Sequence, residues 1–278
     1  MNVRARRYMQ LSAAISAATL IALSCAKEKE KTEETAEQAT HVDPEAPPIV
    51  VAMIDAHGGM AAWRSAEAVS FEDEFGIPGA PSAPSRVTVE QSRRRAYIDF
   101  PGTGQSIVWD GKRAWSTDWT NPTPPRFLAL LNYYFVNLPW LTMDPGVKLA
   151  DAGTDSLWSD PTPYRIVHMT FMPGTGDTPD DRYRLYIDPE SKRLKACAYT
   201  VTYRALLPDS VASTPEHILV YDEWTRADGL LVPAHYTIYS TDQDTLYTCS
   251  IRDWSFQRPF DEGRMTMPDS AVVDETVP

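Results

Sequence analysis

The chain has 278 residues and a formal net charge of −12, with 38 aspartates and glutamates against 26 lysines and arginines. A balance this acidic argues against nucleic-acid binding, which depends on neutralising phosphates with lysine and arginine. It also argues against recruitment to anionic lipid by a cluster of basic residues.

Residues 1–24 have the composition of a secretory signal peptide. Arg4, Arg6 and Arg7 form a basic start, an apolar run without charge continues to Leu23, and Ser24 is a small residue before a cleavage point. The apolar run is shorter than the ~20 residues that a membrane-spanning helix needs. We therefore predict that this segment is a leader and not a transmembrane anchor.

Cys25 changes the prediction from secreted to lipid-anchored. The string "ALSC" resembles the lipobox of bacterial lipoproteins, although Ala22 stands where leucine is usual. We expect Cys25 to be acylated, with residues 25–47 as a charged tether that cannot bury a core. Ala26, in place of aspartate, favours the outer membrane by analogy with lipoprotein sorting. The alternative is an ordinary secreted protein with an incidental cysteine.

From residue 48 onward the composition is that of one globular domain, 48–278. A helix is expected to begin at Pro48, a favourable first residue, and to end at His57-Gly58-Gly59. A second short helical turn is expected around Trp63. His57 is expected to cap the first helix, with a catalytic role as the less favoured alternative.

Most of the remaining chain has the pattern of short β-strands separated by turns. Asp110-Gly111 predicts a tight hairpin, and short turns predict antiparallel pairing of successive strands. Within 194–203, small residues such as Ala196 and Ala198 share one face, which we expect to be concave. The segments with strand character are 95–100, 105–110, 113–117, 164–172, 182–188, 194–203, 217–224, 231–240 and 245–254.

The segment "PPRFLALLNYYFVNLPWLTMDPG" carries no charge between Arg126 and Asp144. Pro124-Pro125 predicts a helix start and Pro139 predicts its end, which gives a helix over 126–138. This helix is too short to span a membrane and lacks the cationic face of an interfacial helix. A helix that is apolar nearly all round is buried on all sides, and one sheet covers only one of them. Another helix, a loop or a ligand must cover the rest.

The motifs of common catalytic sites are absent from the sequence. It contains no H-E-x-x-H, no G-x-S-x-G, no P-loop and no dinucleotide fingerprint, so we predict no catalytic residue, no metal site and no cofactor. The acidic loop with Asp177, Asp180 and Asp181 is expected to hold solvated carboxylates, with a cation site as the alternative.

Cys197 and Cys249 are expected to remain unpaired. Two predicted strands lie between theirs, a separation of about 14 Å in a simple meander. A disulfide requires Cα atoms within ~7 Å.

Several motifs together resemble a known family. They are "AHGGMAAW", "WDGKRAW", "NYYFVNLPWLTMDPG", "DDRYRLYIDPES", "VTYRAL" and "DEWTRADGLLVPAHY". From Ile49 to the end, the chain resembles an uncharacterised family of bacterial envelope lipoproteins in the LolA/LolB-like superfamily. The resemblance implies a mainly β (α+β) fold: a strongly curved antiparallel sheet, an unclosed half barrel with helices covering its concave face. In better-known relatives the cavity holds acyl chains of lipoproteins, without a cofactor.

These observations predict a non-enzymatic envelope protein, lipid-anchored at the periplasmic face of the outer membrane, that binds a lipid or another apolar molecule. The alternatives are a structural or protein-interaction lipoprotein with a filled core and, less favoured, a hydrolase. The expected ligand-binding residues are Phe127, Leu131, Tyr133, Tyr134, Phe135, Leu138, Trp140 and Trp115.

Overall fold

One antiparallel sheet organises residues 46–80 and 82–278, the part of the chain that the computed structural model describes. The helices are α2 (Pro48–Ala56), α3 (Met60–Arg64) and α4 (Pro125–Leu141), with the 3₁₀ turns η1 (Arg204–Leu206) and η2 (Glu262–Met265). The strands are β1 (Ala68–Gly76), β2 (Ser85–Glu90), β3 (Ala96–Phe100), β4 (Gln105–Trp109), β5 (Ala114–Thr117), β6 (Val147–Leu157), β7 (Asp160–Phe171), β8 (Tyr183–Ile187), β9 (Leu194–Tyr199), β10 (His217–Ala227), β11 (Leu230–Ser240), β12 (Thr245–Ser255) and β13 (Val272–Val273).

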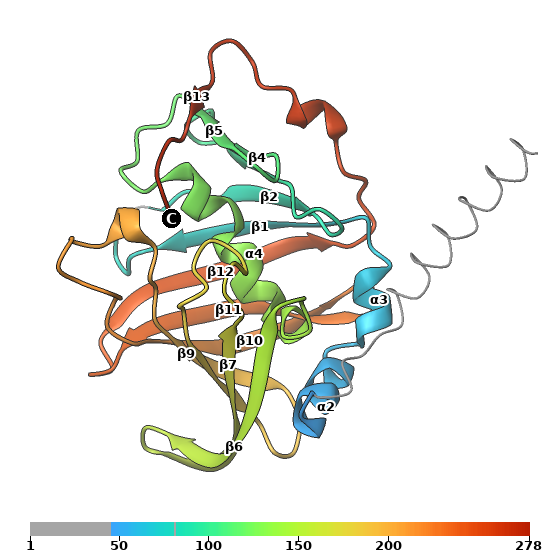
Figure 1. The fold of residues 1–278 in the computed structure, drawn as a ribbon. Coiled ribbons are helices and arrows are strands. Elements are labelled where there is room, and N and C mark those ends of the chain that lie inside the picture. The colour runs from blue at the N-terminus through green and yellow to red at the C-terminus, as the bar shows by residue number, and fades with distance from the viewer. Residues whose placement is uncertain (1–45, 81) are drawn as a thin grey trace, which may run out of the picture. The chain divides into compact units, whose positions relative to one another are not determined.

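The strand order is β13-β5-β4-β3-β2-β1-β12-β11-β10-β9-β8-β7-β6. Two meanders, β1 to β5 and β6 to β12, are joined where β1 pairs with β12. β6 and β13 are opposite edges that do not pair, so the sheet is not closed. Figure 1 shows the sheet bending around α4. The expected fold, mainly β with an unclosed antiparallel half barrel, is confirmed.

The strands predicted in the second meander are present, with two differences. β9 ends at Tyr199 because the chain leaves the sheet before η1, and β6 was not recognised. β6 is an edge strand with the polar sequence VKLADAGTDSL, and most of its residues are exposed. It therefore lacks the apolar alternation by which strands are recognised.

The prediction that the small residues of β9 face the concave side is wrong. Ala196 and Ala198 lie in a smaller apolar cluster on the opposite face, where they meet Tyr186 and Ile218. Cys197 belongs to the main core, which also contains α4. The face towards the helix thus carries the larger side chains of β9, and the alanines allow close packing on the outer face.

Helix α4 runs past the predicted stop, because Pro139 lies inside it and the helix ends at Leu141. A proline in a helix interior leaves the carbonyl four residues earlier without its donor. Here that carbonyl belongs to Phe135, and the Tyr221 hydroxyl from β10 donates a hydrogen bond of 2.6 Å to it. A tyrosine from the sheet thus replaces the missing backbone donor, which allows the last turn to form.

Polar side chains fix α4 to the sheet at its middle. Asn132 donates to the carboxylate of Asp73 on β1 and accepts a hydrogen bond of 2.7 Å from the hydroxyl of Tyr236 on β11. Burial raises the pKa of Asp73, and the Ser85 hydroxyl also donates to its carboxylate. Further along α4, the Asn137 side chain accepts a hydrogen bond of 3.0 Å from the indole N–H of Trp63 on α3. These bonds set the rotation of a helix that is otherwise apolar.

His57 is the C-cap residue of α2, as predicted, and its imidazole is fully buried. Its Nδ1 is 2.9 Å from the Leu231 carbonyl, and its Nε2 accepts from the Leu194 N–H over 3.2 Å. Both bonds are satisfied by the neutral ring with a proton on Nδ1. Burial, more than any other cause, lowers the pKa of His57 to about 4. The ring therefore joins α2 to β9 and β11 as a structural residue.

Cys197 and Cys249 are buried free thiols, as predicted. β10 and β11 lie between their strands β9 and β12. Burial raises the pKa of both thiols well above the usual value, so they stay protonated.

The bond between Tyr221 and the Phe135 carbonyl can be measured by a double-mutant cycle. Tyr221→Phe should lower the free energy of unfolding by about 1–3 kcal/mol, because a buried carbonyl loses its donor. In a Pro139→Ala background the new N–H supplies that donor, so the same substitution should cost under about 1 kcal/mol. Urea unfolding measures all four proteins, and equal costs in both backgrounds would contradict this account.

Acid should unfold the protein partly through His57. Its folded pKa, about 4, lies below the unfolded value of 6.5. Its contribution to stability is therefore complete above pH 6.5 and is lost as the pH falls from 6.5 towards 4, by up to about 3 kcal/mol. His57→Gln should be less stable at pH 7 and should lose less stability across this window. His168→Gln, at an exposed position of β7, is the control and should follow the wild-type profile.

Candidate functional site

A cavity of about 640 Å³ lies between α4 and the sheet. Besides α4, its walls come from the β2–β3 turn at 91–94, the segment 144–147 after α4, residues 171–183 from the end of β7 to the start of β8, and residues 199–203 from the end of β9 onward. Segments distant in sequence therefore converge on one side of a single helix.

The helix wall of the cavity is apolar and follows helical spacing. Phe127, Leu130, Leu131 and Tyr134 recur at intervals of three and four residues, which places them on one face of α4. The opposite face of the helix contributes Ala129 and Val136 to the packed core. The helix that the sequence showed to be apolar nearly all round therefore has one face in the core and another on the cavity.

Aromatic rings form the inner part of the cavity. The ring centroids of Tyr134 and Tyr183 lie 5.7 Å apart, those of Tyr183 and Tyr199 6.0 Å, and those of Tyr199 and Phe135 4.9 Å. Phe171 adds a further edge-to-face contact to Tyr183 at 5.8 Å. Pairs at these separations attract each other beyond their area burial, so this wall is preformed.

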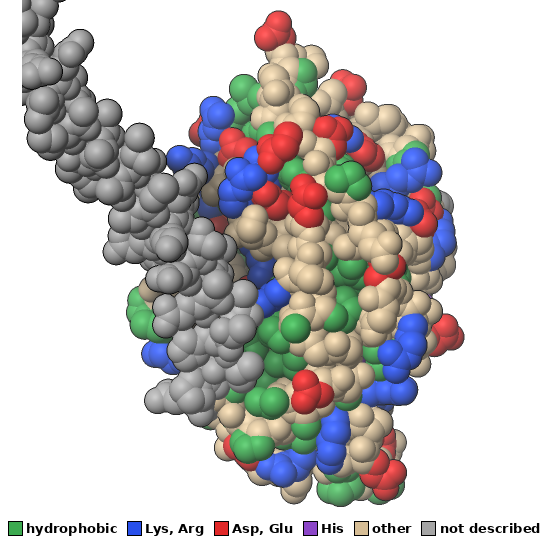
Figure 2. All heavy atoms as spheres, turned by 90° about the vertical axis from the view of Figure 1, so that its right-hand side faces the viewer, with side chains coloured by type: hydrophobic (Ala, Val, Ile, Leu, Met, Phe, Trp, Pro, Cys, Tyr) green, Lys and Arg blue, Asp and Glu red, His purple; other side chains and the backbone are tan. Residues whose placement is uncertain are grey.

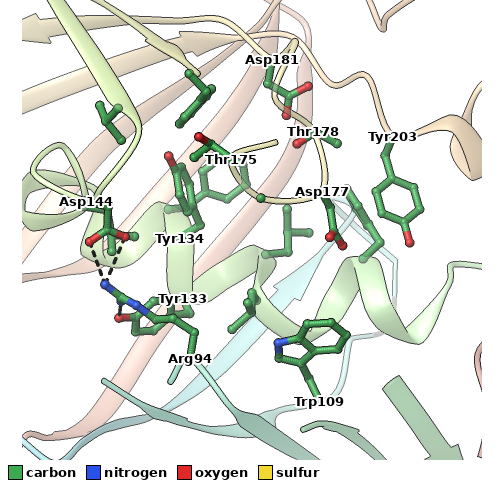
Figure 3. A pocket seen from close by; sticks show the side chains of 18 of the residues that line it. Arg94, Trp109, Tyr133, Tyr134, Asp144, Thr175, Asp177, Thr178, Asp181 and Tyr203 are labelled. Atoms are coloured by element: carbon green, nitrogen blue, oxygen red, sulfur yellow. Dashed lines mark hydrogen bonds and ion pairs between the residues drawn. The ribbon is translucent and has the colours of Figure 1, made fainter. Parts of the chain in front are cut away.

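An ion pair stands at one side of the cavity, as Figure 3 shows. The Arg94 guanidinium donates to both carboxylate oxygens of Asp144, at 2.8 and 3.1 Å, and also to the Tyr133 hydroxyl. It lies over the rings of Trp63 and Tyr133, 5.2 and 5.3 Å from their centroids. Desolvation, the largest cause for each partner, raises the pKa of Asp144 and lowers that of Arg94. Both remain charged at neutral pH because each has the other as partner.

A second ion pair fixes the acidic loop to the start of α4. Arg126 binds both carboxylate oxygens of Asp177, each over 2.7 Å, and its guanidinium lies 4.8 Å from the Trp109 ring centroid. Asp181, near the end of the same loop, accepts from the backbone N–H and hydroxyl of Thr202. These carboxylates have protein partners. In the described residues no three His, Cys, Asp or Glu side chains are grouped as metal ligands.

The structure places five of the eight expected ligand-binding residues on the cavity: Phe127, Leu131, Tyr133, Tyr134 and Phe135. The other three do not line it. Leu138 and Trp140 are fully buried in the core, where Trp140 stacks on Trp63 at 6.0 Å between ring centroids. Trp115 is paired with Val108, which follows the core residue Ile107 on β4. Adjacent residues of a strand face opposite sides of the sheet, so Val108 and Trp115 lie on the face away from α4. Cys25 lies outside the described residues.

Several cavity residues were not identified from the sequence. Arg94, Asp144, Tyr183 and Tyr199 come from separate turns and strands, and only the tertiary fold brings them together. The uncharged helical segment was the available signal for the cavity, and it locates one wall of it. No helix in the described part of the chain is both long enough and apolar enough to cross a membrane.

Solved structures with a similar fold exist, although no protein-family model and no curated protein matches the chain. A DUF1329 family protein from Desulfovibrio piger ATCC 29098 superposes with a TM-score of 0.50 at 10% identity, over 78% of this chain and 97% of that one. A LolA superfamily protein from Nitrosomonas europaea gives 0.49 at 11% identity, over 78% and 96%. Identities this low concern the fold alone, and the likeness at a TM-score of 0.50 agrees with the mainly β, unclosed antiparallel fold expected from the sequence.

Releasing the acidic loop should make it more dynamic. Arg126→Gln removes the bidentate pair with Asp177, so amide hydrogen exchange over 174–181 should accelerate while the free energy of unfolding changes by under about 1 kcal/mol. Arg165→Gln, which removes the similarly half-exposed pair with Asp151, is the matched control. Unchanged exchange over 174–181 in Arg126→Gln would show that the pair does not hold the loop.

Proposed function

We propose that this protein binds an apolar ligand, an acyl chain or another lipid moiety, in the cavity beside α4. The observation that carries the proposal is a volume of about 640 Å³ lined mainly by aromatic and aliphatic side chains. Cavities of 300–1,000 Å³ with such linings and a few placed polar groups are typical of small-molecule sites. The LolA-like fold adds a second reason, because the family resemblance implies a cavity that accepts acyl chains.

The energetics favour a chain-like ligand. Each methylene group removed from water contributes about 0.8 kcal/mol, so ten buried methylenes contribute about 8 kcal/mol. That favourable energy is comparable to the ~4–15 kcal/mol that association costs in lost translational and rotational freedom. Contacts with the aromatic walls add to the favourable energy. The ligand must therefore fill much of the cavity to bind tightly.

The charges around the cavity favour an apolar body over an ionic one. Arg94 and Arg126 are already paired with Asp144 and Asp177, so their charges are offset locally. On the face that Figure 2 shows, basic and acidic side chains are interspersed and form no basic patch. An anionic headgroup would therefore have to displace an existing carboxylate, whereas an apolar chain would not.

The lining residues favour binding over hydrolysis. In the described part of the chain, no histidine and no cysteine lines the cavity, so its serine and threonine hydroxyls have no histidine base beside them and no thiol nucleophile is present. We place the protein in the cell envelope, anchored through acylated Cys25 with residues 25–47 as the tether. An interaction lipoprotein that needs no ligand is the competing function.

Ligand uptake tests the proposal directly. The full chain carrying Cys25→Ser, which removes the predicted acylation site, should retain lipid in native mass spectrometry and take up a fluorescent fatty acid. Leu131→Trp adds bulk to the cavity wall and should weaken uptake at least about tenfold, because the volume for the chain is lost.

The matched control is Ile77→Trp, which adds the same bulk at a position 59% exposed. It should bind like the parent chain. A chain that carries no lipid and takes up no fatty acid would reject the proposal and favour the interaction lipoprotein.

A further inference from the structure

Three tyrosines line the cavity with hydroxyls that have no hydrogen-bond partner among the described residues. They are Tyr134 from α4, Tyr183 from β8 and Tyr199 from β9. The ring centroid of Tyr183 lies 5.7 Å from that of Tyr134 and 6.0 Å from that of Tyr199. Figure 3 shows Tyr134 among the other labelled residues of the cavity. Tyr199 is only 5% exposed. The cavity is therefore apolar in its walls but contains several phenol groups.

Several other buried tyrosines have hydrogen-bond partners among the described residues. Tyr221 donates to the Phe135 carbonyl over 2.6 Å and Tyr236 to Asn132 over 2.7 Å, and both are almost fully buried. Tyr133, which also lines the cavity, donates to Gln91 over 2.6 Å. The hydroxyls of the three tyrosines Tyr134, Tyr183 and Tyr199 are not among the described side-chain atoms that are both buried and unpaired, so they are accessible from the cavity and free to bond a molecule bound there.

The three phenols remain hydrogen-bond donors at neutral pH. Burial raises the pKa of Tyr134 and Tyr183 well above the usual value and raises that of Tyr199 as well. A protonated phenol donates one hydrogen bond and accepts others. Asp144 and Asp181 line the same cavity. Asp144 is paired with Arg94, whereas no ion pair joins Asp181 to a cation among the described residues. The negative charge of Asp181 would repel a carboxylate or phosphate, so the complementary group is an uncharged acceptor.

We propose that the cavity is built for an amphiphile whose buried part carries an uncharged hydrogen-bond acceptor, such as a ketone, ester or ether oxygen. The inference rests on the proposed function and narrows the class of ligand. A saturated chain that filled the cavity would displace water and leave the phenols unpaired. A site that hydrogen-bonds its ligand discriminates strongly against the analogue that lacks the polar group.

A matched pair of ligands tests this class. Palmitic acid is compared with the same chain carrying a ketone beside its terminal methyl group, on the full chain with Cys25→Ser, by displacement of a fluorescent fatty acid. In a cavity without partners the ketone weakens binding, because its oxygen must be desolvated. Here the ketone ligand should bind about fivefold to tenfold more tightly than palmitic acid, as expected for one or two hydrogen bonds.

The triple variant Tyr134→Phe, Tyr183→Phe, Tyr199→Phe should reverse this order, so that palmitic acid becomes the tighter ligand. Tyr203→Phe is the control, because this cavity tyrosine has its hydroxyl 3.4 Å from that of Thr276. It should keep the wild-type preference. For each variant the measured quantity is the ratio of the affinities for the two ligands. Binding of palmitic acid also shows whether the cavity of that variant is intact. If the triple variant does not fold, Tyr199→Phe alone should reduce the preference.

The outcomes separate this inference from the proposed function. Uptake of both ligands with palmitic acid preferred by the parent chain would overturn the inference and leave the proposed function standing. A preference for the ketone that the three phenylalanines do not reduce would also overturn it. Failure to bind either ligand would overturn both.

Discussion

The structure depends on one constraint: α4 carries no charge after Arg126 in its first turn, and a curved sheet can bury only part of its circumference. The core takes Val136, Leu138 and Trp140. The face with Leu130, Leu131 and Tyr134 is left to the loops and to the cavity. The unclosed sheet makes this arrangement possible, because a closed barrel of this kind would have to contain the helix or exclude it. The cavity thus follows from how an apolar helix is covered.

An apolar helix could rotate or slide in such a groove, and the polar contacts prevent this. Asn132 and Asn137 are the amide side chains of α4, and each is bonded to a neighbouring element. Tyr221 adds a third bond at the carbonyl that Pro139 leaves without a donor. Buried polar groups with complete hydrogen bonds specify one arrangement more than they add stability. The position of Tyr134 on the cavity therefore depends on a few side-chain bonds elsewhere on the same helix.

The sequence predicted the architecture better than it predicted the site. Alternating strands with short turns determine an antiparallel meander, and the Asp110-Gly111 hairpin connects β4 and β5 as expected. The predicted helix end at Pro139 was wrong because the compensating donor, Tyr221, is 82 residues away, and local sequence patterns do not reveal it. The prediction that Trp115 lines the cavity was wrong because an aromatic residue in a strand can face either side of the sheet. The phenols of Tyr183 and Tyr199 could not be assigned to a cavity, since their lack of a partner is a property of the folded chain.

The opening of the cavity bears on what fills it. Because the cavity opens to solvent between α4 and the surrounding loops, a ligand that enters it competes with water for the walls and for the phenols. Water can hydrogen-bond to the three phenols but gains little from contact with the aromatic walls. A saturated chain packs well against those walls but cannot hydrogen-bond to the phenols. A chain with an acceptor near its buried end meets both requirements, and the combination of phenols and apolar walls is what distinguishes this cavity from a simple hydrophobic groove.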